Sequence, residues 1–195
     1  MLCIKLGNVR ICAAFSFFFV IGLMGLADGA SALRLFTALG SCLCHESGHI
    51  LAMSLFGSAP EEMTFYGGGI KIVQRKGKAL GRFAETVILL SGCAVNLLLA
   101  ALGFLTGAGL IWKTNLALCV FNLLPFSYFD GGRLMALWLG ERICMALRAV
   151  FVLLLAALVM WLLLAGGLSP SLGAAAAMIF LNELVPISER SDVRG

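Results

Sequence analysis

The chain has 195 residues, of which 61% are hydrophobic and 12% are charged, and its formal net charge is +4. Its mean hydropathy is +1.03, whereas an ordinary soluble domain carries roughly 25% charged residues. This composition excludes a water-soluble globular domain and indicates a chain for which the lipid bilayer is the main solvent.

Long apolar runs recur along the chain, each close to the roughly 20 residues that a helix needs to cross about 30 Å of hydrocarbon. We therefore expect an all-α polytopic membrane protein that forms a single membrane-embedded domain over residues 1–195. About six membrane helices are predicted, over residues 11–27, 32–56, 83–105, 110–139, 143–164 and 171–186. A cleaved signal peptide is the alternative for the first run, which follows basic residues and ends near Ala30-Ser31-Ala32.

A polar interval from Gly57 to Arg82 follows the second run. Within it, Met63–Tyr66 and Ile70–Val73 have strand-like composition and flank the glycines of residues 67–69. This pattern predicts a small hairpin or a re-entrant loop after the second helix.

The seven cysteines are odd in number and contain no CxxC pair. We therefore expect neither a disulfide framework nor a cysteine-based zinc site. Most of them lie in apolar runs, where free cysteine packs as a small buried residue. They are Cys3, Cys12, Cys42, Cys44, Cys93, Cys119 and Cys144.

The placement of basic residues predicts the orientation in the membrane. Six crossings put the N-terminus, the interval from Gly57 to Arg82, the region around Glu141 and the C-terminal tail on one side. All of the 14 Lys and Arg residues except Arg34 and Lys113 then fall on that side. Because basic residues near helix ends are retained in the cytoplasm, both termini are predicted to be cytoplasmic.

The second apolar run contains the HExxH sequence His45-Glu46-Ser47-Gly48-His49. On a helix, the two histidines project from one face and can bind one zinc ion through their imidazole nitrogens. Glu46 then lies beside the metal, where it can activate water as a general base. This chemistry is peptide hydrolysis by a metalloprotease.

The position of the motif strengthens this interpretation, because it lies well inside the run, 13 residues after its start and 7 before its end, which at about 1.5 Å per residue is at least roughly 10 Å from water. A charged group there costs about 2.5–3.5 kcal/mol and by default indicates a functional site. The chain has only these 2 histidines. The simpler alternative is a hydrogen-bonded cluster of His45, Glu46 and His49 that joins helices without metal.

A second acidic residue, Asp130, lies in the fourth run and is the natural third ligand of a two-histidine zinc site with one open position. Pro125 interrupts the helix before it. Gly131 and Gly132 after it permit a tight turn. Asp130 is therefore expected on a kinked or unwound segment that faces the interior of the bundle.

With these segments, the chain resembles the site-2 protease family of intramembrane zinc metalloproteases. Within that family it is most similar to the compact bacterial branch that includes the sporulation sigma-factor processing protease. The resemblance rests on HESGH at residues 45–49, on Asn122, Pro125 and the DGG of residues 130–132, and on the GxxxN pattern of Gly92 and Asn96.

The resemblance implies that His45, His49 and Asp130 bind one Zn²⁺ ion and that Glu46 is the catalytic base. It also implies that four residues shape the site or bind substrate, namely Asn122, Pro125, Gly92 and Asn96. Gly92 and Asn96 equally suit a plain helix-packing face. The loop of residues 67–69 would match the membrane-associated loop that guides an extended substrate.

The implied substrates are membrane-spanning or membrane-associated proteins in the lipid bilayer, and regulatory membrane proteins are further partners that the resemblance admits. The implied location is the bacterial cytoplasmic membrane, and no nucleic-acid partner is expected. Three residues depart from the usual family pattern, and none of them is an implied ligand: Ser47, Tyr128 and Phe129. No PDZ or CBS-type domain is expected.

Two functions from other classes stay open. A catalytically inactive scaffold could bind metal or hold a substrate without cutting it, but such a site has no use for Glu46. A metal transporter would use intramembrane His and acidic residues as an ion path. A transporter favours ligands spread along a route and repeated segments, whereas this chain has one cluster and no evident repeat.

Overall fold

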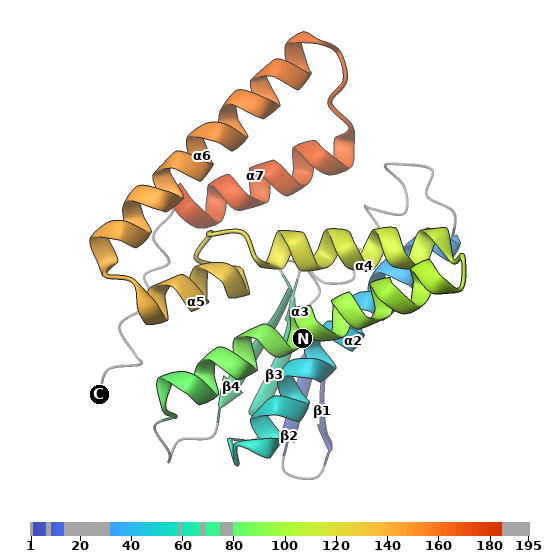
Figure 1. The fold of residues 1–195 in the computed structure, drawn as a ribbon, viewed down its shortest axis with the longest axis vertical. Coiled ribbons are helices and arrows are strands. Elements are labelled where there is room, and N and C mark those ends of the chain that lie inside the picture. Colours follow the sequence, from blue (N-terminus) through green and yellow to red (C-terminus); the bar gives the residue numbers. More distant parts are fainter. Residues whose placement is uncertain are drawn as a thin grey trace. The chain divides into compact units, whose positions relative to one another are not determined.

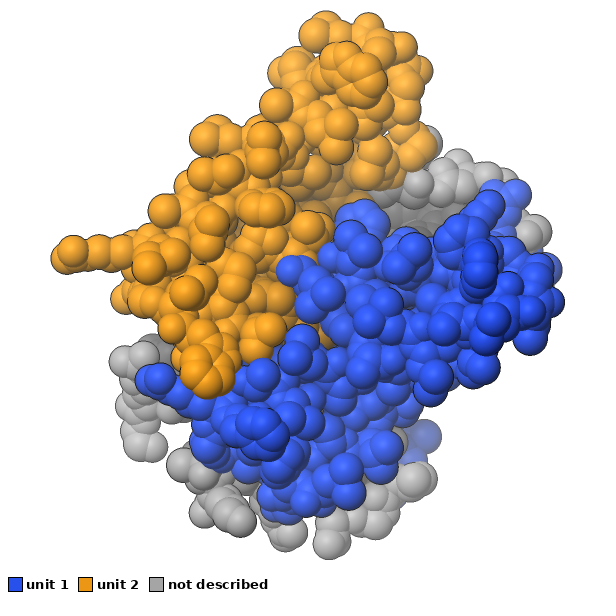
Figure 2. Space-filling model, in the orientation of Figure 1, with its two compact units in different colours: residues 1–123 blue, residues 124–195 orange. Residues whose placement is uncertain are grey.

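A computed structural model describes residues 2–6, 9–13, 32–58, 60–66, 69–74 and 80–184. Most of these residues are helical. The chain divides into two compact units, residues 1–123 and residues 124–195, which Figure 2 draws in different colours. Each unit has its own set of helices.

Helices form the larger part of the first unit (Figure 1). They are α2 (Ala32–Leu55), α3 (Arg82–Leu105) and α4 (Gly109–Asn122). α3 packs against both α2 and α4, and α2 also contacts α4. Gly107, with a φ of 71°, makes the turn between α3 and α4 in a conformation that favours glycine. A hydrophobic cluster of Ala52, Met53 and Ile88 joins α2 to α3.

The first unit also contains a four-stranded sheet in the order β1-β2-β3-β4. The strands are β1 (Leu2–Leu6), β2 (Val9–Ala13), β3 (Pro60–Tyr66) and β4 (Gly69–Gln74). β1 and β2 are antiparallel, β2 and β3 are parallel, and β3 and β4 are antiparallel. β3 and β4 coincide with the two segments of strand-like composition, and residues 67–68 between them lie outside the described residues.

The predicted helix over residues 11–27 is wrong at its start, because residues 11–13 belong to β2. The backbone of this segment pairs with β1 on one side and with β3 on the other, so its hydrogen bonds are made across strands. Residues 14–27 lie outside the described residues, as do residues 30–31 of the alternative signal-peptide interpretation. The fold is therefore mainly helical with a sheet, and not entirely helical.

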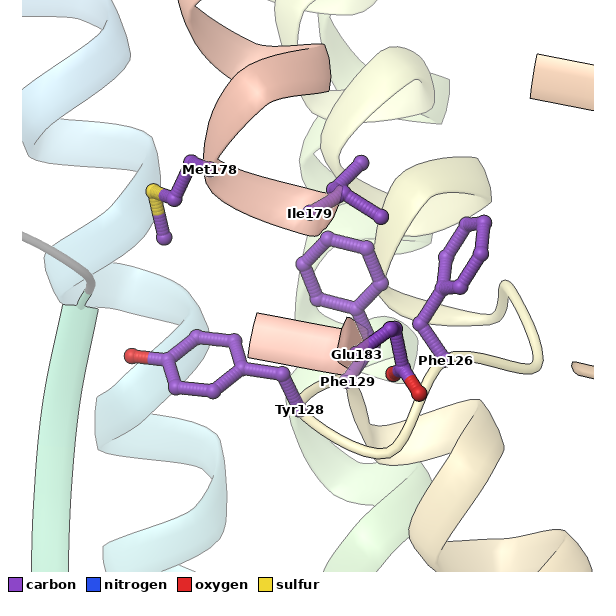
Figure 3. A pocket seen from close by; sticks show the side chains of 6 residues that line it. All are labelled: Phe126, Tyr128, Phe129, Met178, Ile179 and Glu183. Carbon is purple, nitrogen blue, oxygen red and sulfur yellow. The ribbon is translucent and has the colours of Figure 1, made fainter. Parts of the chain in front are cut away.

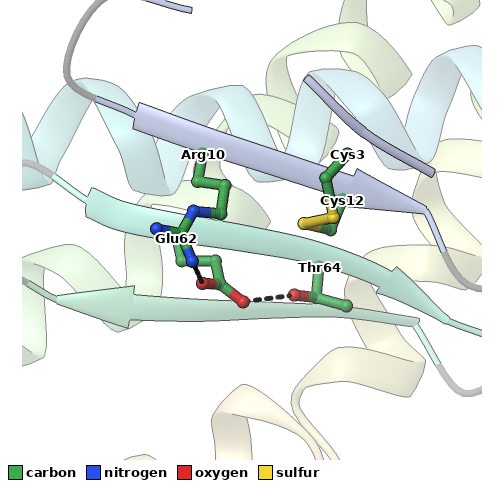
Figure 4. The surroundings of a disulfide bond; sticks show 5 residues. All are labelled: Cys3, Arg10, Cys12, Glu62 and Thr64. Atoms are coloured by element: carbon green, nitrogen blue, oxygen red, sulfur yellow. Dashed lines mark hydrogen bonds and ion pairs between the residues drawn. A yellow bond between two sulfur atoms is a disulfide. The ribbon is translucent and has the colours of Figure 1, made fainter. Parts of the chain in front are cut away.

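The interpretation of the cysteines is wrong for Cys3 and Cys12, which are partners in the antiparallel register of β1 and β2. Their Cα atoms lie 4.1 Å apart and the two residues form a disulfide (Figure 4). Their spacing along the chain did not reveal this pairing, which depends on the strand register. Beside it, Arg10 forms an ion pair with Glu62 at 3.5 Å, and the Thr64 hydroxyl donates to Glu62 at 3.2 Å. Five cysteines form no disulfide within the described residues: Cys42, Cys44, Cys93, Cys119 and Cys144.

The second unit contains α5 (Asp130–Trp138), α6 (Glu141–Leu164) and α7 (Pro170–Leu184). α6 packs against α5 and against α7. The predicted run of residues 110–139 is divided, because α4 ends at Asn122 and α5 begins at Asp130. This interruption contains Pro125, where the sequence predicted a break.

Two of the described helices, α3 and α6, are long and apolar enough to cross a membrane. α6 leaves large apolar side chains exposed, among them Leu153 at 69%, Trp161 at 64% and Leu164 at 82%. Exposure of so large an apolar surface to water is unfavourable. The exposed side chains of α6 therefore indicate contact with lipid or protein. The count of six crossings and the cytoplasmic side of the termini stay predictions.

Candidate metal centre

His45 and His49 lie one turn apart on α2 and both side chains are buried, with exposed fractions of 4% and 6%. Their Nε2 atoms are 3.1 Å apart, and the rings meet edge to face at a centroid distance of 4.8 Å. The i and i+4 spacing of the HExxH motif produces this convergence, because a helix turns once in 3.6 residues.

The outer nitrogen of His49 is held by the backbone of α3. Nδ1 of His49 lies 2.7 Å from the carbonyl oxygen of Ile88, which can only accept a hydrogen bond, so Nδ1 carries the proton. Nε2 is then the acceptor nitrogen and is suited to bind a metal. The Ser91 hydroxyl donates to the same carbonyl oxygen at 2.6 Å and lies 3.4 Å from Nδ1 of His49.

Asn96 provides the matching contact for His45. Its side chain is completely buried, and Nδ2 lies 3.1 Å from Nδ1 of His45, while Oδ1 has no hydrogen-bond partner within the described part of the chain. The two orientations of a side-chain amide are nearly equal in shape. Turned by 180°, the amide would accept through Oδ1 a hydrogen bond from the Nδ1–H of His45, which leaves Nε2 of His45 as the metal-binding nitrogen and satisfies Oδ1.

Two glycines let α2 and α3 approach closely at this point. A Cβ atom on Gly92 would lie 2.5 Å from Nε2 of His49 and 2.7 Å from Nε2 of His45. A Cβ atom on Gly48 would lie 2.7 Å from the carbonyl oxygen of Ser91. Position 92 therefore borders the space between the two imidazoles directly, and any side chain there would displace them.

The pair of histidines fits a zinc ion. Two nitrogen ligands at 2.0–2.1 Å from a tetrahedral zinc ion are about 3.3 Å apart, close to the 3.1 Å between the Nε2 atoms. Two neutral imidazoles that turn acceptor nitrogens toward each other repel unless a cation lies near both, since each nitrogen carries a lone pair. The two buried Nε2 atoms of the first unit therefore suit a divalent metal as ligands.

Glu46 follows His45 on α2 and is half-buried. Successive residues of a helix are turned by about 100°. The Glu46 side chain therefore projects to one side of the helix face that carries the two histidines. An acid in that position is available for proton transfer next to the histidine pair.

Asp130 is the first residue of α5 in the second unit and is buried, with an exposed fraction of 9%. A carboxylate in the first turn interacts favourably with the positive end of the helix dipole. A Cβ atom on Gly132 would collide with the carbonyl group of Phe126, because the preceding loop folds back onto the first turn of α5. The DGG sequence thus allows this loop to pack closely against the start of the helix.

Asn122 lies at the start of the interruption before Asp130, and Pro125 lies within it. Asn122 is the last residue of α4, and its side-chain amide donates to the carbonyl oxygen of Leu118 in the same helix at 3.0 Å. Pro125 is buried within the loop. The side chain of Asn122 thus makes this hydrogen bond within the last turn of its own helix.

Sequence reasoning missed two contributors to the surroundings of His49, the Ile88 carbonyl and Ser91. The Ile88 carbonyl has no sequence signal, since every residue has one. Ser91 could have been suspected from its place directly before Gly92. Sequence reasoning also passed over Glu183 of α7, which like Asp130 is an acid within an apolar run.

The structure is similar to a solved structure described as the site-2 protease from Methanocaldococcus jannaschii. The TM-score is 0.66, the sequence identity is 17%, and the similarity covers 94% of this chain and 93% of that chain. At this identity the similarity shows the fold alone. No protein-family model matches the sequence, and no curated protein matches it.

Proposed function

We propose that this chain is an intramembrane zinc metalloprotease of the site-2 protease type, which hydrolyses peptide bonds of membrane-spanning or membrane-associated proteins. The proposal depends chiefly on the two buried Nε2 atoms that lie 3.1 Å apart on α2, next to Glu46 in the chain. The fold similarity to a solved site-2 protease extends over 94% of the chain and supports it.

In this proposal His45, His49 and Asp130 hold one zinc ion. All three side chains are buried and are of the types that bind metal. Two imidazoles and one carboxylate are a common catalytic zinc set that keeps one position open. Gly92 provides the room for the imidazoles, and Asn96 and the Ile88 carbonyl fix their orientation.

Zinc, when bound, supplies a Lewis acid that makes water a competent nucleophile near neutral pH. The Glu46 carboxylate accepts one proton from the water whose oxygen bonds to the scissile carbonyl carbon. It then donates this proton to the leaving amine nitrogen as the C–N bond breaks. Because the carboxylate ends in its initial state, Glu46 is a true catalyst in this scheme.

The proposed substrates lie in the bilayer, where a helical peptide bond is hydrogen-bonded and remote from water. The exposed apolar side chains of α6 support a lipid setting. Six crossings, cytoplasmic termini, the bacterial cytoplasmic membrane and regulatory membrane proteins belong to the same proposal. Membership of the compact bacterial branch that includes the sporulation sigma-factor processing protease is also part of the proposal, and the short motifs support it. Pro125 and Asn122 would shape the loop beside the metal.

The test is cleavage of a co-reconstituted membrane-anchored reporter by detergent-purified wild type and by Glu46→Gln. Loss of a general base slows a reaction by roughly 10²–10⁴-fold, so the variant should fall by that factor and keep its zinc. Glu85→Gln, the same substitution in the first turn of α3, is the matched control and should cleave at the wild-type rate. Cleavage by Glu46→Gln at the wild-type rate would remove the protease assignment and leave a metal-binding scaffold.

A further inference from the structure

Glu183 is an acidic residue in α7 to which the proposed reaction assigns no role. It lines a small pocket in the second unit together with apolar side chains of α7 and of the loop before α5 (Figure 3). The other residues of the pocket are Phe126, Tyr128, Phe129, Met178 and Ile179. A carboxylate within an apolar run is costly, so its presence there indicates a specific task.

The Glu183 carboxylate binds the loop directly. Its Oε1 atom accepts a hydrogen bond from the backbone N–H of Ser127 at 2.6 Å and another from the Ser127 hydroxyl at 2.7 Å. Hydrogen bonds to a carboxylate are roughly twice as strong as bonds between neutral groups. The two bonds join positions that are 56 residues apart in the sequence, so they tie the loop to α7.

The same loop is held at two further points. Phe126 is 3% exposed and its ring meets the ring of Phe151 of α6 edge to face at 6.4 Å. Its carbonyl oxygen accepts a hydrogen bond from the N–H of Phe129 at 3.1 Å and lies against Gly132. Ser127 is the neighbour of Phe126 in this loop, and the hydrogen bonds to Glu183 of α7 restrain it further.

This loop decides where α5 begins. Phe129 caps the helix in an extended conformation, and its carbonyl accepts the first helical hydrogen bond, from the N–H of Arg133 at 3.1 Å. Asp130 is the next residue after Phe129 and lies three positions after Ser127. A shift of Ser127 would therefore change the position of the Asp130 carboxylate.

We propose that Glu183 is a positioning residue for Asp130, which acts by fixing Ser127 and thereby the start of α5. The inference rests on the proposed function, in which Asp130 is a zinc ligand. This role requires a hydrogen-bond acceptor at position 183, since one oxygen atom accepts both hydrogen bonds from Ser127. The amide oxygen of glutamine can accept the same two bonds.

The experiment measures zinc affinity by chelator competition on the full chain in detergent, for Glu183→Ala and Glu183→Gln. Residues that orient ligands change metal affinity by about 10–100-fold. Glu183→Ala should show a loss in this range, and Glu183→Gln should restore most of it. Cobalt substitution gives a second readout, because a displaced carboxylate ligand changes the visible absorption of Co²⁺.

Both substitutions are then repeated in an Asp130→Ala background. If Glu183 acts through Asp130, Glu183→Ala has no further effect on zinc affinity there. An equal loss in both backgrounds, or no loss in the wild-type background, would overturn the positioning role. If Glu183→Ala does not fold, Ser127→Ala takes its place, since it removes one of the two bonds and keeps the backbone N–H.

The experiment separates the two proposals. Wild-type protein without zinc, or with zinc affinity indifferent to Asp130→Ala, contradicts the proposed function itself. Zinc that depends on Asp130 but not on Glu183 or Ser127 contradicts only the positioning role.

Discussion

Gly92 of α3 lies directly against Nε2 of His49, so that a Cβ atom on the glycine would be 2.5 Å from that nitrogen. Gly92→Ala should therefore displace the imidazoles and reduce zinc affinity by about tenfold or more, the range found for residues that orient ligands. Helix α3 should persist, since alanine favours helix by about 1 kcal/mol over glycine. Zinc affinity and circular dichroism on the same samples test both statements.

Gly40→Ala is the control for this substitution, because Gly40 also lies in a helix, α2, and a Cβ atom there would meet nothing within 4 Å. It should leave zinc affinity unchanged. A Gly92→Ala protein with wild-type zinc affinity would show that the imidazoles are not fixed where the structure has them.

Asn96→Ala should weaken zinc binding, because the amide orients His45 through Nδ1. The expected loss is about 10–100-fold. Asn115→Ala is a matched control: Asn115 is likewise buried in the first unit, but its amide donates to the Ile111 carbonyl of its own helix at 2.9 Å. Both changes should lower thermal stability, whereas only Asn96→Ala should lower zinc affinity. Equal zinc affinity in the two variants would argue against the role of Asn96.

Gly132→Ala should disturb the loop before α5, since the new methyl group would collide with the Phe126 carbonyl. We expect a stability loss of about 1–3 kcal/mol, typical of overpacking, together with weaker zinc binding. Gly173→Ala in α7, where the nearest atom to a Cβ lies at 3.6 Å, should be neutral. Denaturation midpoints and zinc content are the measurements, and a Gly132→Ala protein as stable as Gly173→Ala would contradict the close packing.

Cys3 and Cys12 should resist maleimide labelling in intact cells until a reductant is added, because they form a disulfide between β1 and β2. A disulfide is typical of an oxidising compartment, whereas the distribution of basic residues predicts a cytoplasmic N-terminus. The disulfide and a cytoplasmic N-terminus therefore oppose each other. Labelling of both cysteines without reductant would contradict the disulfide and support the orientation predicted from charge, and protection until reduction would contradict that orientation. A Cys3→Ser, Cys12→Ser protein, which lacks both thiols, gives the background.

The helices could be predicted from the sequence because each of them contains one long apolar run. α2, α3 and α6 begin and end within two residues of the runs predicted for them. The interruption before Asp130 was also predictable, since proline removes a backbone donor. These features depend on local residues alone.

The N-terminal strands were not predicted, because β1 and β2 are short and apolar like the start of a membrane helix. β2 pairs in parallel with β3, about 50 residues later in the chain, and such pairing connects distant segments. The Cys3–Cys12 disulfide follows from the antiparallel register of β1 and β2 and was missed because neither strand was predicted.

The candidate site was predictable in its side chains but not in its backbone partners. The HExxH spacing gives the convergence of His45 and His49, and the GxxxN pattern pointed to Gly92 and Asn96. The Ile88 carbonyl that fixes the tautomer of His49 is a tertiary contact between helices, and no pattern of residue types encodes it. The role of Asp130 as a ligand stays a proposal.

The zinc content of purified wild type and Asp130→Ala, measured side by side with Glu141→Ala, tests the central claim most directly. Glu141 is an exposed acid in the first turn of α6 and serves as the matched control. The proposed site predicts close to one zinc ion per chain in wild type and in Glu141→Ala, and loss of most of the metal in Asp130→Ala. Wild-type protein without zinc, or Asp130→Ala with wild-type zinc content, would contradict it.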